Sequence, residues 1–211
     1  MSDKDKIGWL KERLLKPLPG RGAQELMGAR VKPMPDVLPE NARASAVLSL
    51  LFLHNDHLHT LLIQRTDDGK AHSGQISFPG GRYESSDGDL VTTALREANE
   101  EVGIAAADVE ILGGLTPLYI PVSNFIVHPF IGYSGKQLFY TPSSNEVART
   151  IEVPLEELLH PERKAKVEVT SPVDKTFRRT VPAYRLNDGT IIWGATAMIF
   201  SELQVLFEEY K

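Results

Sequence analysis

The chain has 211 residues, enough for one domain with a sizeable core, and its 42% hydrophobic and 24% charged residues are typical of a globular protein. The net charge of −5 argues against general nucleic-acid binding, so an acidic substrate such as a phosphate compound needs local Lys, Arg or a metal ion. The absence of cysteine excludes disulfides and cysteine-based zinc or nucleophile chemistry.

The N-terminal residues predict a helix followed by an irregular arm. They carry charge where a signal peptide needs an apolar run, and no stretch of the chain approaches the roughly 18 apolar residues that span a membrane. We therefore expect a cytoplasmic protein without a membrane partner. Residues 6–16 have apolar side chains at helical spacing, and residues 17–40 are rich in proline. We assign 1–40 to this helix and Pro-rich arm, and 41–211 to the main domain.

Two apolar stretches predict the first strands. Residues 44–53 form a near-continuous apolar run, as in a buried strand, and residues 58–64 return after a polar turn, so 44–64 predicts a β-hairpin. Further along, Asp89 is suited to cap a helix over 90–102, and Gly103 is suited to end it.

The rest of the chain mixes strands and helices without regular βαβ alternation. This pattern predicts an α/β (α+β) fold in which helices sandwich a mixed β-sheet. The predicted strands cover 108–119, 125–133, 147–153, 166–170, 178–186 and 190–193. The predicted helices cover 154–159, with Pro154 in the first helical position, and 195–209.

The most informative stretch is R-E-A-N-E-E-V-G at 96–103, which follows F-P-G-G at 78–81. Glu97, Glu100 and Glu101 are spaced i, i+3 and i+4, so a helix brings them to one face, and Arg96 can pair with Glu100. Mg²⁺ prefers such oxygen ligands. Taken alone, the cluster is more simply a solvated helix face. The Gly-Gly turn upstream, where backbone can approach closely, favours a metal site.

The stretch from Gly81 to Ile104 resembles the Nudix box, G-x5-E-x7-R-E-U-x-E-E-x-G-U, in which U is apolar. The matching residues are Gly81, Arg96, Glu97, Ala98, Glu100, Glu101, Gly103 and Ile104. Two positions depart from the pattern: Asp87 stands where the box has its first Glu, and Arg96 comes one residue late.

Residues 61–81 resemble the signature that precedes the box in the coenzyme A pyrophosphatase branch of Nudix hydrolases, in which the extra residue before the Arg also occurs. The matching residues are Leu61, Arg65, His72, Gly74, Phe78, Pro79, Gly80 and Gly81. Residues 116–132 and 193–199 also resemble that branch.

The resemblance implies a Nudix-like α/β/α sandwich that hydrolyses a nucleoside diphosphate derivative with Mg²⁺ or Mn²⁺ as cofactor. For this branch the substrate is coenzyme A and the products are 3′,5′-ADP and 4′-phosphopantetheine. The implied metal ligands are Glu97, Glu100 and Glu101, with the Gly81 carbonyl as an extra ligand. Arg96 orients the glutamates, and Glu146 best matches the later glutamate that serves as metal ligand or general base.

Four more residues are candidates for substrate binding. Arg65 and Lys70 can meet the diphosphate or the 3′-phosphate, with solvated charge as the alternative. His72 stands in the branch signature and can equally be a structural loop residue. Asn124 can border the pocket.

Other readings stay open from the sequence. One is a Nudix hydrolase of ADP-ribose, NADH or a modified nucleotide. Another is a catalytically silent nucleotide-binding domain, against which the three retained glutamates argue. The resemblance is also compatible with a homodimer, to which the Pro-rich arm can contribute. The histidines at 54, 57 and 59 are more simply exposed polar residues than a metal site.

Overall fold

The structure is a computed structural model that describes residues 3–29, 37–67, 73–170 and 178–210. Eight strands form the central sheet: β1 Arg43–His54, β2 His57–Arg65, β3 Ile76–Ser77, β4 Gly80–Arg82, β5 Glu110–Gly114, β6 Leu118–Ile120, β7 Phe125–Ser134 and β8 Val147–Pro154. Their order is β3–β2–β1–β7–β5, with β4 paired to β1, β6 to β7 and β8 to β2. The sheet is mixed because β1 and β7 run parallel, whereas the other pairs are antiparallel.

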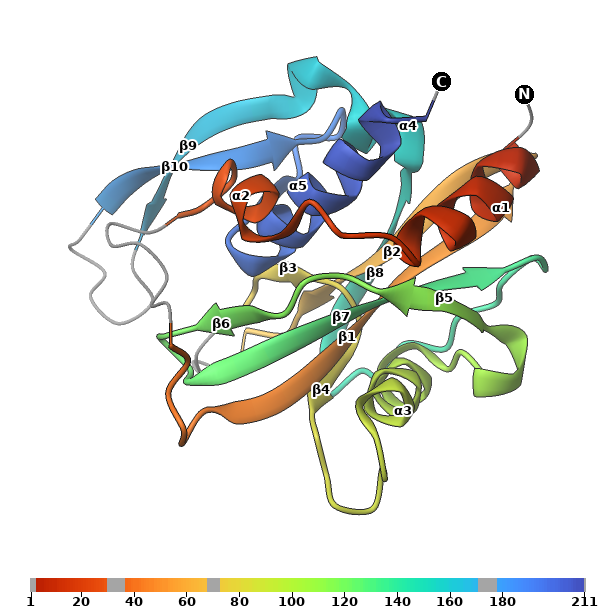
Figure 1. Ribbon diagram of the computed structural model, residues 1–211. Helices are drawn as coiled ribbons and strands as arrows, with labels where there is room; N and C mark the ends of the chain where they lie inside the picture. The colour runs from red at the N-terminus through yellow and green to blue at the C-terminus, as the bar shows by residue number, and fades with distance from the viewer. Residues whose placement is uncertain (1–2, 30–36, 68–72, 171–177, 211) are drawn as a thin grey trace.

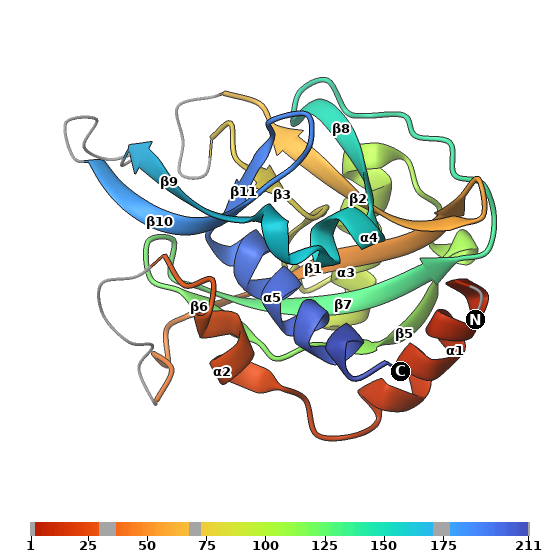
Figure 2. The same cartoon turned by 90° about the horizontal axis from the view of Figure 1, so that it is seen from above.

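Helices cover both faces of this sheet, as Figures 1 and 2 show. One face carries α3 (Leu90–Val102), and the other carries α5 (Ala195–Glu208). The helices α1 (Asp3–Leu14), α2 (Gly20–Glu25) and α4 (Leu155–Leu159) lie on the α5 side, together with a second sheet of three strands. That sheet has the order β11–β10–β9 and consists of β9 Lys164–Thr170, β10 Arg178–Arg185 and β11 Ile191–Trp193. Two 3₁₀ turns, Ala106–Asp108 and Pro161–Arg163, complete the described elements.

The alternation of side chains along β1 fills two cores. Leu48 and Leu50 belong to the core beneath α3, whereas Leu51 belongs to the core beneath α5. Successive residues of a strand point to opposite faces, so a strand covered on both sides reads as a near-continuous apolar run. The expected α/β/α sandwich with a mixed sheet is confirmed.

The predicted hairpin over 44–64 is present as β1 and β2, paired from Leu51↔Thr60 to His54↔His57. The helix over 90–102 is also confirmed with both ends. The Asp89 carboxylate accepts a hydrogen bond from the Thr92 N–H at 2.7 Å, and Gly103 adopts the left-handed conformation with φ of 73°.

Three local predictions are corrected. The single strand over 108–119 is two strands, β5 and β6, which both pair with β7 and are separated by residues 115–117. The arm over 17–40 contains the short helix α2. Pro154 ends β8 and precedes the first residue of α4.

The N-terminal segment packs on the main domain through α5. Ile7 and Leu10 of α1 join the core beneath α5, and α2 is held by a carboxylate inside the protein. Glu202 of α5 is fully buried and accepts hydrogen bonds from the Gly20 N–H at 3.0 Å and from the Gln24 amide at 2.9 Å. A domain boundary at residue 40 stays a prediction.

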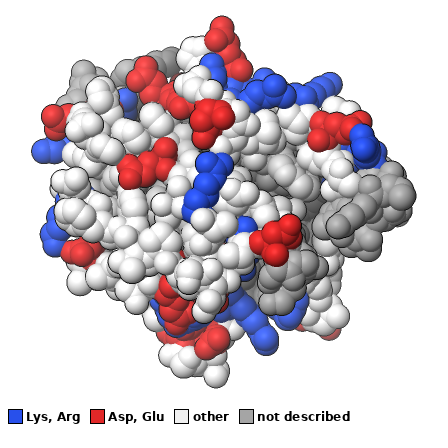
Figure 3. Space-filling view, turned by 180° about the vertical axis from the view of Figure 1, so that it is seen from behind, with Lys and Arg blue, Asp and Glu red and all other residues white. Residues whose placement is uncertain are grey.

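The surface charges are mixed in sign. Figure 3 shows Lys and Arg interspersed with Asp and Glu over the face opposite to that of Figure 1. Within the described part of the chain, no helix is long and apolar enough to cross a membrane.

Candidate active site

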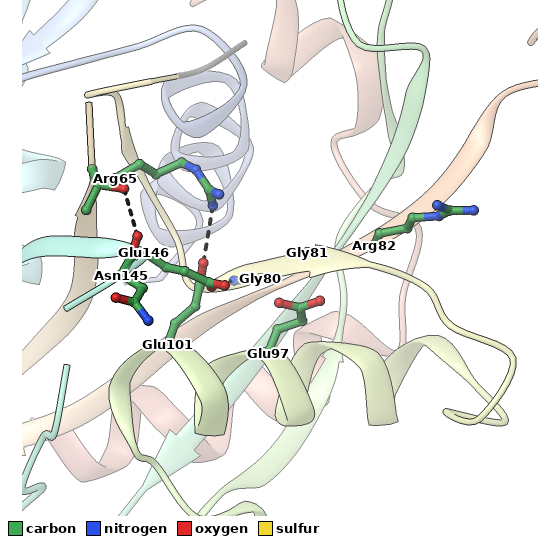
Figure 4. Close-up of a pocket in the computed structure, with 9 residues that line it drawn as sticks. Arg65, Gly80, Gly81, Arg82, Glu97, Glu101, Asn145 and Glu146 are labelled. Atoms are coloured by element: carbon green, nitrogen blue, oxygen red, sulfur yellow. Dashed lines mark hydrogen bonds and ion pairs between the residues drawn. The ribbon is translucent and has the colours of Figure 1, made fainter. Parts of the chain in front are cut away.

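The glutamate-rich helix α3 forms because its sequence is amphipathic and capped at both ends. Ala94, Ala98 and Val102 repeat at helical spacing and pack into the core beneath the sheet. The glutamates lie beside this apolar face, so the end of the helix turns acidic side chains toward β4 and the end of β2. Figure 4 shows Glu97 and Glu101 pointing up from α3 toward Gly81 and Arg65.

The two glycines of β4 bring its backbone against both β1 and α3. A Cβ at Gly80 would lie 2.3 Å from the Ala46 carbonyl oxygen on β1, inside the backbone of the neighbouring strand. A Cβ at Gly81 would lie 2.3 Å from Oε1 of Glu97. Only glycine permits both approaches. The Gly-Gly turn therefore places β4 directly against the Glu97 carboxylate.

Arg96 connects the loop before α3 to the glutamates. Its Nε donates to Oδ1 of Asp87 at 2.7 Å, and its Nη atoms lie 3.0 Å from Oε1 of Glu97 and 2.9 Å from Oε2 of Glu100. The Asp87 side chain is only 2% exposed, and its hydrogen bond with Arg96 holds the pKa of this carboxyl well below its usual range. The extra residue before Arg96 thus leaves the pairing with Asp87 in place.

Glu101 is the most buried carboxylate of the site. Its side chain is 1% exposed; Oε2 accepts from the Gly80 N–H at 2.8 Å, and Oε1 accepts from Nη1 of Arg65 at 3.2 Å. Burial raises the pKa of Glu101 to about 7, against the lowering by Gly80 and Arg65, and the negative charges of Glu97 and Glu146 add to the increase. Burial likewise raises the pKa of Glu97.

Glu146 reaches the same place from the loop between β7 and β8. Two backbone bonds dock this loop on the C-terminal end of α3: the Thr141 N–H donates to the Val102 carbonyl, and the Ser143 N–H donates to the Glu101 carbonyl, both at 2.9 Å. The Thr66 N–H then donates to the Glu146 carbonyl at 3.0 Å. The loop is therefore tied both to the helix that carries Glu101 and to the end of β2.

These segments enclose a pocket of about 380 Å³, drawn in Figure 4. Its lining residues come from β2, β4, α3 and the β7–β8 loop, and they are Arg65, Thr66, Gly80, Gly81, Arg82, Glu97, Glu101, Asn145 and Glu146. The structure thus brings together five of the predicted site residues: Arg65, Gly81, Glu97, Glu101 and Glu146.

Other predicted residues lie elsewhere. Glu100 does not line the pocket, because its side chain is 55% exposed and paired with Arg96, which itself contacts the site through Glu97. Asn124 lies in the β6–β7 turn, where its side chain accepts from the Tyr119 hydroxyl and donates to the Asn41 carbonyl, and it does not line the pocket. Lys70 and His72 lie outside the described residues.

Three lining residues escaped the sequence analysis: Thr66, Arg82 and Asn145. Arg82 directly follows the glycine pair and Thr66 directly follows Arg65, so adjacency to motif residues was an available signal for these two. Nothing local in the sequence marks Asn145 apart from its position beside Glu146.

The composition of the pocket fits a hard divalent cation. Its acidic groups are all carboxylates, and the raised pKa values of Glu97 and Glu101 reflect buried negative charge that such a cation would stabilise. Among the described residues, no three His, Asp or Glu side chains already converge in a way that could hold a metal ion. The carboxylates are instead held by arginines and a backbone N–H, so ligation requires side chains to turn.

The histidines of the β1–β2 hairpin are engaged in other contacts. His54 Nδ1 lies 2.7 Å from Oε2 of Glu152, and His59 Nδ1 lies 3.0 Å from the His57 carbonyl oxygen. Among the described residues, His54 and His57 are exposed and His59 is partly buried.

Known proteins share this sequence and this fold. The family model described as the NUDIX domain matches residues 43–172. The uncharacterized Nudix hydrolase NudL of Citrobacter koseri is 37% identical over 163 residues, which are 77% of this chain and 82% of that protein. NudL of an Enterobacter species is 37% identical over 174 residues, which are 82% of this chain and 86% of that protein.

Solved structures support the architecture. A MutT/nudix family protein from Enterococcus faecalis superposes with a TM-score of 0.54 and 16% identity, over 99% of this chain and 75% of that one. The MutT protein from Methanosarcina mazei Go1 gives a TM-score of 0.52 and 17% identity, over 82% of this chain and 99% of that one. At these identities the likeness shows the fold alone.

Proposed function

The chain belongs to the Nudix family of hydrolases, and from this premise we propose that it cleaves the diphosphate bond of coenzyme A to 3′,5′-ADP and 4′-phosphopantetheine. Its family makes it a hydrolase that acts on a nucleoside diphosphate derivative. The choice of coenzyme A rests on the signature at 61–81, including Arg65 and the Phe78–Gly81 stretch, and on the extra residue before Arg96.

One observation carries the proposal. Three carboxylates, Glu97 and Glu101 from α3 and Glu146 from the β7–β8 loop, line one pocket with the Gly80–Gly81 turn. A divalent cation bound there would polarise a phosphoryl oxygen and lower the pKa of a bound water. We propose that Glu97 and Glu101 hold this ion, Mg²⁺ or Mn²⁺, with the Gly81 carbonyl as a further ligand.

The protein groups have distinct tasks in the hydrolysis. Arg96 keeps Glu97 in place through the 3.0 Å contact and is itself fixed by the buried Asp87. Glu146 accepts a proton from the attacking water, whose oxygen bonds to one phosphorus while the bridging P–O bond breaks and its electron pair leaves with the other phosphate. Glu100 stays a predicted ligand that must first leave Arg96.

The volume and the lining of the pocket indicate which part of a substrate it can hold. A volume of about 380 Å³ is at the lower end for ligand sites, so it accommodates the diphosphate and its immediate neighbours, and the rest of a coenzyme A molecule must extend beyond it. Arg65 at the rim is placed to contact phosphate oxygens. We propose that Lys70 and His72 add contacts from the signature. The Asn124 side chain is committed to Tyr119 and Asn41, so its predicted role in binding requires those bonds to break.

The test is incubation with coenzyme A and Mg²⁺ or Mn²⁺, with ADP-ribose and NADH in parallel, and separation of the products. We expect 3′,5′-ADP and 4′-phosphopantetheine, no turnover in chelator, and slower turnover by Glu146→Gln. Cleavage of ADP-ribose or NADH without cleavage of coenzyme A would reject the substrate and keep the reaction class. Nucleotide binding without any metal-dependent cleavage would instead identify a silent binding domain.

A further inference from the structure

Arg65 contacts the Glu101 oxygen that the backbone leaves available to the proposed cation. Its Nη1 donates to Oε1 of Glu101 at 3.2 Å, while the Gly80 N–H holds the other oxygen at 2.8 Å. Figure 4 shows the Arg65 guanidinium turned down onto Glu101 at the mouth of the pocket. Oε1 is therefore the atom of Glu101 whose partner is a partly exposed side chain and not the backbone.

The two cations compete for this oxygen. A divalent ion ligated by Oε1 lies about 2.0–2.2 Å from it and carries two positive charges, so it repels a guanidinium that donates to the same atom. Among the described residues, no three such side chains form a ready metal site, and the Arg65 contact occupies one oxygen of Glu101. Ligation of the ion by this oxygen is favoured when Arg65 moves away.

The structure gives Arg65 the freedom to do so. Its side chain is 38% exposed, whereas that of Glu101 is 1% exposed, so the arginine can turn while the glutamate keeps its place. Arg65 ends β2, and the pairing of β2 with β8 becomes irregular between Gln64 and Arg65. Such irregularities redirect side chains at the end of a strand. The same side chain lines the pocket in which the diphosphate is proposed to bind.

We propose that Arg65 exchanges partners during the binding cycle: it holds Oε1 of Glu101 until a divalent cation binds, and then turns to the diphosphate of the substrate. The inference rests on the proposed function, because it requires the metal site at Glu101. Arg65 therefore has opposite effects on the affinities for the ion and for the diphosphate. Arg65 weakens binding of the ion on its own and strengthens binding of the diphosphate once the ion is present.

The first measurement is Mn²⁺ binding by calorimetry without nucleotide. Arg65→Gln is expected to bind Mn²⁺ roughly fivefold or more tightly than the wild type, since competition for Oε1 is removed. Arg82→Gln is the matched control, because it removes the same charge from a pocket residue whose side chain points away from Glu101 (Figure 4). Its Mn²⁺ affinity is expected to change by less than about twofold, as for an exposed charge at a distance.

The second measurement uses methylenediphosphonate, a diphosphate analogue whose P–C–P linkage resists hydrolysis, at saturating Mn²⁺. Arg65→Gln is expected to bind it about tenfold more weakly, as after loss of a charge-assisted hydrogen bond. If Arg65→Gln does not fold, Arg65→Lys carries the test and must shift both affinities in the same directions, because its ammonium lacks the planar fork.

The outcomes distinguish a failure of the proposed function from a failure of the partner exchange by Arg65. A wild-type protein that binds no Mn²⁺ overturns the proposed function and this inference with it. A wild-type protein that binds Mn²⁺, with Arg65→Gln unchanged or weaker for the ion, overturns the exchange alone. Weaker binding of both Mn²⁺ and methylenediphosphonate by Arg65→Gln would likewise reject the exchange. It would indicate that Arg65 only holds Glu101 in position.

Discussion

Replacing Gly81 with alanine would place a Cβ 2.3 Å from Oε1 and 2.4 Å from the carboxyl carbon of Glu97. Real Cβ contacts essentially never fall below 3.0 Å, so the carboxylate must retreat by at least about 0.7 Å, from 2.3 to 3.0 Å. Gly81 has no positive φ, so alanine is compatible with the backbone itself. The substitution therefore displaces one carboxylate and leaves the strand intact.

The size of the effect follows from the chemistry of the ion. Mg²⁺ holds its ligands at about 2.0–2.1 Å in near-ideal geometry, and a misplacement on the order of 1 Å in an active site can cost about 100-fold in rate. We expect Gly81→Ala to lower kcat/KM by about that factor and to weaken Mn²⁺ binding. The free energy of unfolding is expected to change by less than about 1 kcal/mol.

Steady-state kinetics, calorimetry with Mn²⁺ and urea unfolding measure these quantities. Gly80→Ala is the contrasting variant, because its Cβ would meet the Ala46 carbonyl at 2.3 Å and the Val47 Cα at 2.6 Å, which are backbone atoms. That variant is expected to lose stability through the β1–β4 pairing.

A substitution of Glu97 tests whether the new Cβ acts by displacing the Glu97 carboxylate. Glu97→Asp shortens the side chain and makes room for the new methyl group, so adding Gly81→Ala to it should cost little more than Glu97→Asp alone. Wild-type metal binding by Gly81→Ala, or fully additive losses in this double-mutant cycle, would refute the proposed contact between β4 and Glu97.

Buried carboxylates lead to four further predictions. Glu101→Gln is expected to abolish most turnover and Mn²⁺ binding while circular dichroism stays unchanged, and retention of activity would mean that the metal site lies elsewhere. Because burial raises the pKa of Glu101 to about 7 and ligation needs the carboxylate, Mn²⁺ affinity should rise with pH up to about 7 and flatten above it; a flat calorimetric profile from about pH 5.5 to 8 would contradict this. Without metal, the same raised pKa makes the unfolding free energy decrease as pH rises from about 4.5 to about 7. Glu202→Ala leaves donors on Gly20, Gln24 and Thr116 without their acceptor and should destabilise the protein by about 3–5 kcal/mol in urea, whereas exposed Glu208→Ala should have little effect.

The sequence predicts a helix or strand correctly where the interactions that form it lie between residues close along the chain. The cap at Asp89, the left-handed residue Gly103 and the apolar repeat between them define α3 in the sequence as they do in the structure. The break between β5 and β6 involves a contact that the local sequence does not show, because the Thr116 N–H within it donates to the Glu202 carboxylate of α5. The helix α2 escaped for a similar reason: its sequence G-R-G-A-Q-E is a weak helix former, and Glu202 of α5 holds it.

The same distinction between local and distant interactions applies to the residues of the candidate site. Spacing placed three glutamates on one helix face but did not say which of them turns inward. The structure turns Glu101 inward because it continues the row of Ala94 and Ala98, which are buried, whereas Glu100 lies one turn from Arg96 and pairs with it in solvent. That extension of the buried row was readable in the sequence. The approach of Asn145 to Thr66 was not, since it arises only when distant segments come together.

The docking of Thr141 and Ser143 on the end of α3 limits where the chain can change in length. Residues 141–146 span a fixed distance between the carbonyls of Glu101 and Val102 and the first residue of β8. An insertion there would shift Glu146 relative to Glu101. Leu138 and Tyr140 pack against the core beneath α3, so residues 135–137 are the part of this loop that lies before both packed segments. We therefore expect differences in loop length among relatives to concentrate at 135–137 and not within 138–146.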